Sequence, residues 1–206
     1  MILLAYDTSA VCLSIALYKG SQKINELDSE PGARHATVLA PMIQKLLKKS
    51  RIKLSDVDVV AVGIGPGSFT GLRVGIATAK ILGYVLKKKI VGVTSLEAIA
   101  REALTGEDAR IAVALDARRS RVYGAVYEQR GDKFKVIQTP ALFEEKKFQE
   151  ISASADRLIG KNEAPRASGI AAAAFSMIQN KTFINPLRLE PLYLQPRDCN
   201  VTLPKK

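Results

Sequence analysis

Short apolar runs bounded by turn residues dominate the first half of the chain, and each has the length of a β-strand. The first run ends at Asp7. The second alternates Leu13, Ile15 and Leu17 with smaller or polar residues, as half-buried strands do. The predicted strands span residues 2–6, 12–18, 23–27, 59–64 and 90–93.

Apolar residues at helical spacing predict three helices among these strands. The first follows residues 31–32 and ends near Lys49, and Pro41 must lie in its first turns or bend it. The second continues from the glycine-rich stretch after the fourth strand. The third begins at Thr94, which forms a capping box with Glu97. Helices between strands, after an opening meander, predict an α/β fold with a mixed sheet and right-handed crossovers.

Residues 63–86 join a predicted strand to a long helix through the loop GPGSFTG. Such a loop could hold a phosphate on its backbone N–H groups, or it could be a tight turn that needs glycine. The Walker pattern is absent because Leu72 follows Gly71, and Ser68 stands where a dinucleotide loop has its third glycine. The candidate phosphate or nucleotide residues are Asp7, Gly65, Gly67 and Ser68.

The helix after this loop is apolar around most of its circumference, with only Arg73, Thr78 and Lys80 clearly polar. Such a helix should be buried on both sides. Small residues recur at every fourth position: Gly71, Gly75, Ala79 and Gly83. This ridge would admit either the backbone of a partner helix or the chain's own sheet. The breadth of the apolar surface favours a partner.

The opening pattern recurs in the second half of the chain. Asp116 ends an apolar run 109 residues after Asp7, and Tyr127 follows Tyr18 at the same offset. We interpret this as a duplicated domain whose second copy is weaker and lacks a glycine loop. The later predicted elements are strands at 111–115, 122–127, 134–137 and 158–159 and a helix at 170–178, whereas 143–151 is charged and only loosely periodic.

The charge balance is basic, with 31 Lys and Arg against 20 Asp and Glu and a formal net charge of +11. This favours an anionic partner such as RNA or an acidic protein surface, although each basic cluster could equally be a solvated face. Few aromatic residues lie beside the clusters, which argues against base stacking. The clusters lie at 45–53, 87–89 and 118–121.

Residue counts limit the chemistry. Cys12 and Cys199 are isolated, so the sequence predicts neither a disulfide framework nor a zinc site, and His35 is the only histidine.

No signal peptide or membrane span is recognisable, and we expect a cytoplasmic protein. An Asp at the end of each first strand suggests the actin-like, sugar-kinase-like phosphotransferases, but Asp7 and Asp116 could instead cap their own turns. Nothing in the sequence assembles a nucleophile.

The chain resembles the TsaB family, also called YeaZ, in four segments that keep their order: DTS at 7–9, GIGPGSFTGLRVGIATAK at 63–80, LDARR at 115–119 with VY at 122–123, and EPLYL at 190–194. The resemblance implies an actin-like ATPase (ribonuclease H-like) fold of two similar lobes, each a mixed sheet flanked by helices. We expect residues 1–108 to form the N-terminal lobe and 109–206 a smaller, degenerate C-terminal lobe.

The resemblance also implies a non-catalytic subunit of the complex that installs threonylcarbamoyl on the adenosine beside the tRNA anticodon. The implied partners are a TsaD-like catalytic paralogue, a TsaE-like ATPase, a second copy of the chain when TsaD is absent, and tRNA through the complex. No cofactor or metal is predicted. A lone His35 cannot form the His-x-x-x-His metal pair of the catalytic paralogue.

The family pairs through its first two helices, which correspond here to 35–49 and 71–86. The predicted interface residues are His35, Leu39, Met42, Leu46, Gly71, Leu72, Gly75, Ile76, Ala79 and Gly83. Two other function classes stay open: an enzyme in its own right, either a small-molecule kinase or a glycoprotease-like protein, and an RNA-binding module carried by the basic clusters.

Overall fold

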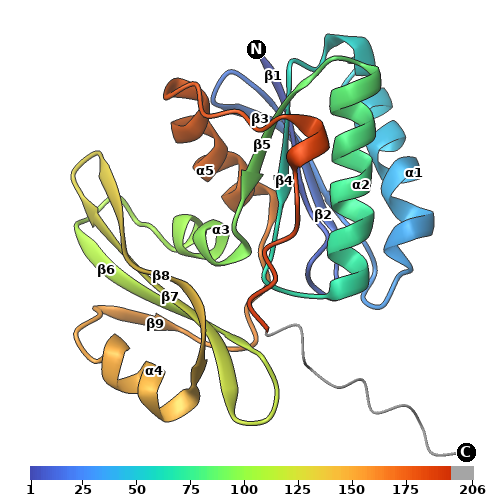
Figure 1. Ribbon diagram of the computed structural model, residues 1–206. Coiled ribbons are helices and arrows are strands. Elements are labelled where there is room, and N and C mark those ends of the chain that lie inside the picture. The colour runs from blue at the N-terminus through green and yellow to red at the C-terminus, as the bar shows by residue number, and fades with distance from the viewer. Residues whose placement is uncertain (196–206) are drawn as a thin grey trace, which may run out of the picture.

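The computed structural model describes residues 1–195 and contains two mixed β-sheets flanked by helices (Figure 1). The first sheet has the order β3 (Gln22–Asp28), β2 (Ser14–Lys19), β1 (Ile2–Asp7), β4 (Val59–Gly63) and β5 (Lys89–Val93). The second has the order β8 (Lys133–Glu144), β7 (Arg121–Arg130), β6 (Ala109–Asp116) and β9 (Arg157–Ile159). This is the α/β, actin-like class that the sequence predicts.

Five α-helices connect and cover the sheets: α1 (His35–Lys49), α2 (Phe69–Val85), α3 (Ser95–Glu102), α4 (Glu145–Ser152) and α5 (Ala167–Gln179). The strands and helices predicted from the apolar pattern are confirmed, with shifts at their ends. Thr94 is the N-cap of α3, and its hydroxyl accepts the N–H of Glu97. The sequence did not indicate α4, because Phe148 and Ile151 are its only apolar residues and two positions are too few to establish a helical period.

The duplicated architecture is confirmed by strand order, since β3-β2-β1-β4 and β8-β7-β6-β9 are equivalent. Strand β1 pairs antiparallel with β2 and parallel with β4. In the same way β6 pairs antiparallel with β7 and parallel with β9. Asp7 and Asp116 end the two equivalent strands, β1 and β6.

The helices form layers around the first sheet. Helices α1 and α2 pack on one face, and α5 packs on the other against β1 and β2 (Figure 1). Helix α3 lies between the sheets, because Ala98 joins the core under α5 whereas Leu96 and Ile99 pack against β6 and β7. Because α5 follows β9 and packs on the first sheet, the chain returns to that sheet after it has formed the second. The division into lobes at residues 108 and 109 stays a prediction.

Among residues 1–195, no helix combines the length and apolar content that crossing a bilayer requires. Cys12 is a free, partly exposed thiol, whereas Cys199 lies outside the described residues.

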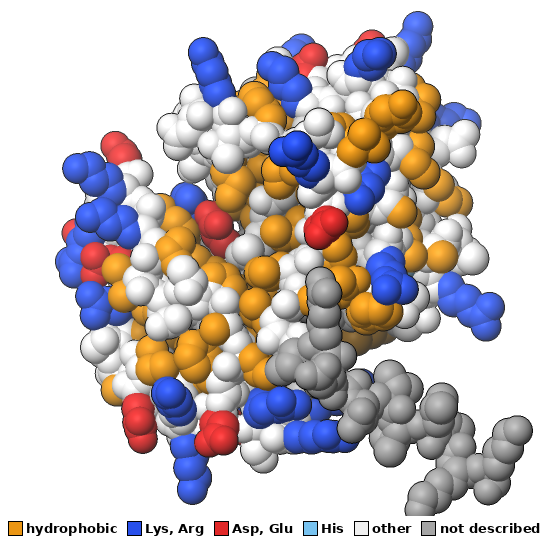
Figure 2. Space-filling model, viewed as in Figure 1, with side chains coloured by type: hydrophobic (Ala, Val, Ile, Leu, Met, Phe, Trp, Pro, Cys, Tyr) orange, Lys and Arg blue, Asp and Glu red, His pale blue; other side chains and the backbone are white. Residues whose placement is uncertain are grey.

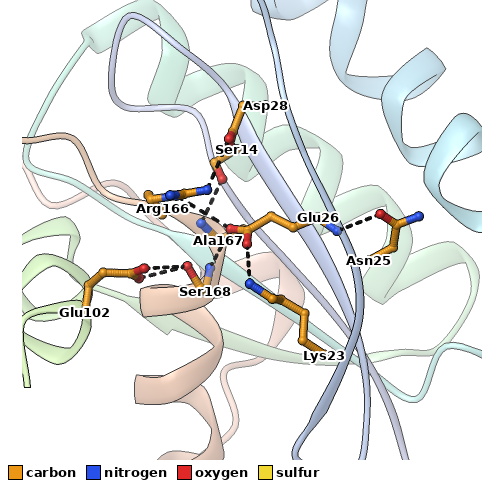
Figure 3. Close-up of polar contacts among 9 residues, drawn as sticks. All are labelled: Ser14, Lys23, Asn25, Glu26, Asp28, Glu102, Arg166, Ala167 and Ser168. Carbon is orange, nitrogen blue, oxygen red and sulfur yellow. Dashed lines mark hydrogen bonds and ion pairs between the residues drawn. The ribbon is translucent and has the colours of Figure 1, made fainter. Parts of the chain in front are cut away.

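The first turn of α5 is capped by residues from other elements (Figure 3). Arg166 precedes the helix and has no side-chain cap bond. The buried Ser14 hydroxyl of β2 accepts the N–H of Ala167 at 2.9 Å, and the Glu26 carboxylate of β3 accepts the N–H of Ser168 at 3.3 Å. The sheet therefore supplies the acceptors that a helix N-terminus needs.

Replacing Ser14 by Ala should lower the free energy of unfolding by about 1 kcal/mol, because the buried N–H of Ala167 loses its acceptor. Urea unfolding would measure this loss. Ser21→Ala, an exposed serine in the β2–β3 turn, is the matched control. Equal stabilities for the two variants would contradict the capping role.

Candidate functional site

The carboxyl end of β1 carries a buried polar cluster. Asp7 is 0% exposed, and its carboxylate accepts the N–H of Ser9 at 2.6 Å and the hydroxyl of Ser95 at 3.0 Å. The hydroxyls of Ser9 and Ser95 lie 3.0 Å apart. The Asp7 carboxylate thus has protein donors on both oxygens.

The glycine loop closes over this cluster. A Cβ at Gly63 would overlap the Asp7 carboxylate, and a Cβ at Gly67 would lie 2.6 Å from Ser9 Cβ. The N–H of Ser68 is donated to the carbonyl of Ser9 at 2.7 Å, and the Ser68 hydroxyl accepts the N–H of Gly71 at 3.2 Å. Two of the N–H groups that could bind an anion are therefore already in use.

The four candidate phosphate residues are brought to one end of the sheet, but they do not form an open site. Asp7 and Gly65 are buried, whereas Gly67 and Ser68 are exposed. The Asp7 carboxylate cannot meet a nucleotide or a metal-bound water unless the loop moves away. Phosphate binding at these residues stays a prediction.

Burial raises the pKa of Asp7 above its ordinary value of 3.8, although the hydrogen bonds from Ser9 and Ser95 and the nearby His35 lower it. The folded protein therefore retains this proton at a pH where the unfolded chain has released it. The contribution of Asp7 to stability is present at low pH and is lost as the pH rises above about 4.

Replacing Asp7 by Asn should flatten the pH dependence of stability above about pH 4, because the amide cannot ionise but can still accept the N–H of Ser9. Urea unfolding at a series of pH values would measure this. Asp116→Asn, at the equivalent exposed position on β6, is the control. An unchanged pH profile in the Asp7 variant would contradict the burial argument.

The ridge of small residues on α2 faces the chain's own sheet. A Cβ at Gly71 would overlap the carbonyl oxygen of Thr8, and a Cβ at Gly75 would overlap its hydroxyl oxygen. Thr8 Oγ1 donates to the carbonyl of Gly71 at 2.8 Å, and Tyr6 donates to that of Gly75 at 2.9 Å. The sequence left two explanations of this ridge open, and close packing on the sheet is the one that the structure has.

None of the ten predicted interface residues is exposed. Eight are buried within the chain: Leu39, Leu46, Gly71, Leu72, Gly75, Ile76, Ala79 and Gly83. His35 and Met42 are half-buried. The assignment of the ridge to a partner contact is therefore corrected, because sheet residues already cover it. An interface on these two helices remains a prediction that must rest on other residues.

Adding a methyl group at Gly75 should destabilise the fold. The gain in helix propensity is about 1 kcal/mol, and overpacking costs about 1–3 kcal/mol. We expect Gly75→Ala to lose about 1 kcal/mol, since the Thr8 hydroxyl must move. Urea unfolding is the measurement, and Gly160→Ala, with no atom within 4 Å of the new methyl, is the control. A Gly75→Ala variant more stable than wild type would contradict this packing.

The opposite side of α2 is apolar and exposed. Ile81 is 61%, Tyr84 64% and Val85 63% exposed. Between α1 and α2 lies an open groove of about 610 Å³. Its lining residues are Ala40, Ile43, Gln44, Leu47, Lys48, Ile52, Leu54, Thr78, Ile81 and Leu82. Figure 2 shows hydrophobic side chains gathered over this part of α2. Exposed apolar surface of this kind is typical of a protein interface.

An aromatic and arginine cluster lies at the start of α2. The Arg73 guanidinium lies 3.8 Å from the centre of the Phe69 ring, and the rings of Phe69 and Tyr193 are 5.3 Å apart. The N–H of Leu192 is donated to the carbonyl of Ile64 at 2.8 Å. The motif at 190–194 therefore lies against the glycine stretch, although more than a hundred residues separate them in sequence.

Sequence reasoning missed Phe69, Arg73 and Tyr193 as candidate interface residues. Ile81, Tyr84 and Val85 belong to the broad apolar surface that the sequence predicts for this helix, but they are not among the predicted interface residues. For Arg73, Ile81 and Val85 the signal was available, because a residue two positions after each small residue lies on the other side of a helix.

His35 lies at the start of α1, with Nδ1 3.1 Å from the carbonyl oxygen of Thr8 and Nε2 3.3 Å from that of Val11. It thus joins α1 to the loop after β1. Within the described part of the chain, no three His, Cys, Asp or Glu side chains are grouped as metal ligands.

Comparisons with known proteins give matches named for one tRNA modification under two protein names, TsaD and TsaB. A family model described as TsaD, tRNA N6-adenosine threonylcarbamoyltransferase, matches residues 29–189. The tRNA threonylcarbamoyladenosine biosynthesis protein TsaB of Escherichia coli is 32% identical over 159 residues, which cover 74% of this chain and 68% of that protein. TsaB of Haemophilus influenzae is 40% identical over 124 residues, which cover 59% of this chain and 51% of the relative.

Among solved structures, YeaZ from Pseudomonas aeruginosa matches with a TM-score of 0.83 at 25% identity. The match covers 94% of this chain and 99% of that one. The alignment to the curated sequences thus spans about half to two thirds of their length, whereas the structural match extends over nearly the whole chain.

Proposed function

Because the chain belongs to the TsaB family, whose members are named for tRNA threonylcarbamoyladenosine biosynthesis, we propose that it is a non-catalytic partner subunit of that pathway. In this role it binds and supports a TsaD-like catalytic paralogue. The observation that carries the proposal is the exposed apolar face of α1 and α2, which we call the helix face: the groove between the helices together with Ile81, Tyr84 and Val85.

The helix face has the composition of a docking surface. Large apolar side chains line it, and Tyr84 adds a residue type that is enriched at binding hot spots. The Phe69–Arg73–Tyr193 cluster, at the other end of α2, offers the same residue types. Lys48 is the charged residue among those that line the groove. A protein partner would remove this apolar surface from water, which is the main favourable term in association.

The strand-end cluster supports the non-catalytic part of the proposal. Asp7 is the acid that an actin-like phosphotransferase would present, and here it is fully buried beneath the glycine loop. Micromolar ATP binding in calorimetry that disappears on replacing Asp7 would instead favour the alternative, a small-molecule kinase or glycoprotease-like enzyme.

We assign a second copy of this chain to the same face when the TsaD-like partner is absent. Both partners would cover Ile81 and Tyr84, so the homodimer and the heterodimer exclude one another. In this proposal a TsaE-like ATPase and tRNA join through the complex, and the chain acts in the cytoplasm.

Replacing Ile81 and Tyr84 together by Glu should weaken binding of the TsaD-like paralogue from the same organism, with a loss of about 2 kcal/mol or more in binding free energy. Both side chains are largely exposed, so the variant should unfold at the same urea concentration as wild type. Calorimetric titration of the two purified proteins is the measurement.

The matched control is Ile137→Glu, an exposed apolar residue on β8 of the second sheet. It should bind the paralogue normally. Undiminished binding by the Ile81 and Tyr84 variant, with the fold intact, would count against the helix face as the docking site.

A further inference from the structure

Two basic clusters that are distant in sequence meet at one end of the molecule. Helices α1 and α2 finish at the same end (Figure 1), and Lys88 Nζ, after α2, donates to the carbonyl oxygen of Ser55, after α1, at 2.6 Å. We call this surface the basic end. Its members are Lys48, Lys49, Arg51, Lys53, Lys87 and Lys88. Lys and Arg side chains project around this end in Figure 2.

The positive charge of the basic end is not balanced by its surroundings. Among the described residues, none of its six side chains lies in an ion pair. Asp58 is 3.9 Å from the amino group of Met1, which leaves Asp56 as the unpaired acid of this region. Two helix C-termini add only about one negative charge together. An excess of about four positive charges remains.

Backbone geometry adds a second observation, although the same left-handed φ occurs at Lys181 after α5, which is not one of the six. Arg51 and Lys87 follow the C-caps of α1 and α2, and both have φ of 54°. Glycine or asparagine is usual at this left-handed position, because a side chain is strained there. The chain places a basic residue at both positions in spite of the strain. The helix dipole favours cations in or beside the last turn, but Lys53 and Lys88 lie beyond it.

The residue types of the basic end distinguish between two kinds of anionic partner. Five of the six are lysines, and lysine is depleted at protein–protein interfaces, where arginine and aromatic residues are enriched. Lysines that act as mobile point charges suit a chain of phosphates. Tyr84 lies beside Lys87 and Lys88 but belongs to the helix face, so the basic end itself offers charges for phosphates rather than rings for base stacking.

We propose that the basic end binds the phosphate backbone of RNA. The choice of tRNA as the RNA rests on the proposed function, whereas phosphate binding does not. The basic end adjoins the helix face, since Lys48 and Ile52 also line the groove between α1 and α2. RNA bound here would lie beside a protein partner docked on those helices.

The test uses the full chain alone, without a TsaD-like partner, and a fluorescent, unmodified tRNA transcript. Binding is measured by anisotropy between 50 and 200 mM salt. Replacing both Arg51 and Lys87 by Asn removes two charges and suits the left-handed backbone, so the fold should remain intact. We expect the slope of log affinity against log salt to become shallower by about 1.4 to 1.8.

The matched control replaces Lys133 and Lys135 of β8 by Gln, which removes the same net charge from the second sheet. It should keep more of the wild-type slope than the Asn variant. Lys48→Gln with Lys53→Gln is a further variant that leaves the left-handed positions unchanged, and it should resemble the Asn variant.

Three results would overturn the proposal: no salt-dependent tRNA binding by the wild-type chain, equal losses in the Asn variant and the control, or equal affinity for poly-glutamate, which would indicate a general anion surface. The paralogue titration reports on the helix face separately. The Asn variant should bind the paralogue normally, so failure of one proposal is distinguishable from failure of the other.

Discussion

The close packing of α2 on the end of β1 is the constraint on which the rest of the molecule depends. Thr8 fits against Gly71 and Gly75 so closely that no side chain can intervene, and its hydroxyl is bonded to the helix backbone. Buried backbone groups must find partners, and here Thr8 and Tyr6 supply additional donors to helix carbonyls. This contact sets the distance of α2 from the sheet and also draws the glycine loop over Asp7.

The same contact separates the buried polar cluster at the strand end from the exposed surface of α2. Once α2 is pressed onto the sheet, the loop that precedes it lies against Ser9, and Asp7 is left with protein donors and no solvent. The large side chains of α2 that cannot fit beneath the helix then lie on its outer side. A closed strand end and an open apolar helix face are thus two consequences of one packing arrangement.

The sequence predicted the elements well, because alternation and helical spacing are local properties. It also predicted the repeat, since β1 and β6 both end in Asp after an apolar run. It could not show which side of α2 packs on the sheet. A glycine in a helix indicates that another group lies close to it, but not whether that group belongs to the same chain or to a partner. The return of α5 to the first sheet depends on contacts between Ala167 and Ser14, which no local pattern records.

The ridge of small residues also determines which residues of α2 face away from the sheet. Small residues recur at positions 71, 75, 79 and 83, and a helix turns by about half a circle over two residues, so Arg73, Ala77, Ile81 and Val85 must lie opposite them. All four are exposed. The small residues therefore locate the exposed face of α2, which we propose a partner covers, although they take no part in it. Their tight fit to β1 holds that surface rigid, and a rigid apolar face loses less conformational freedom when another protein covers it.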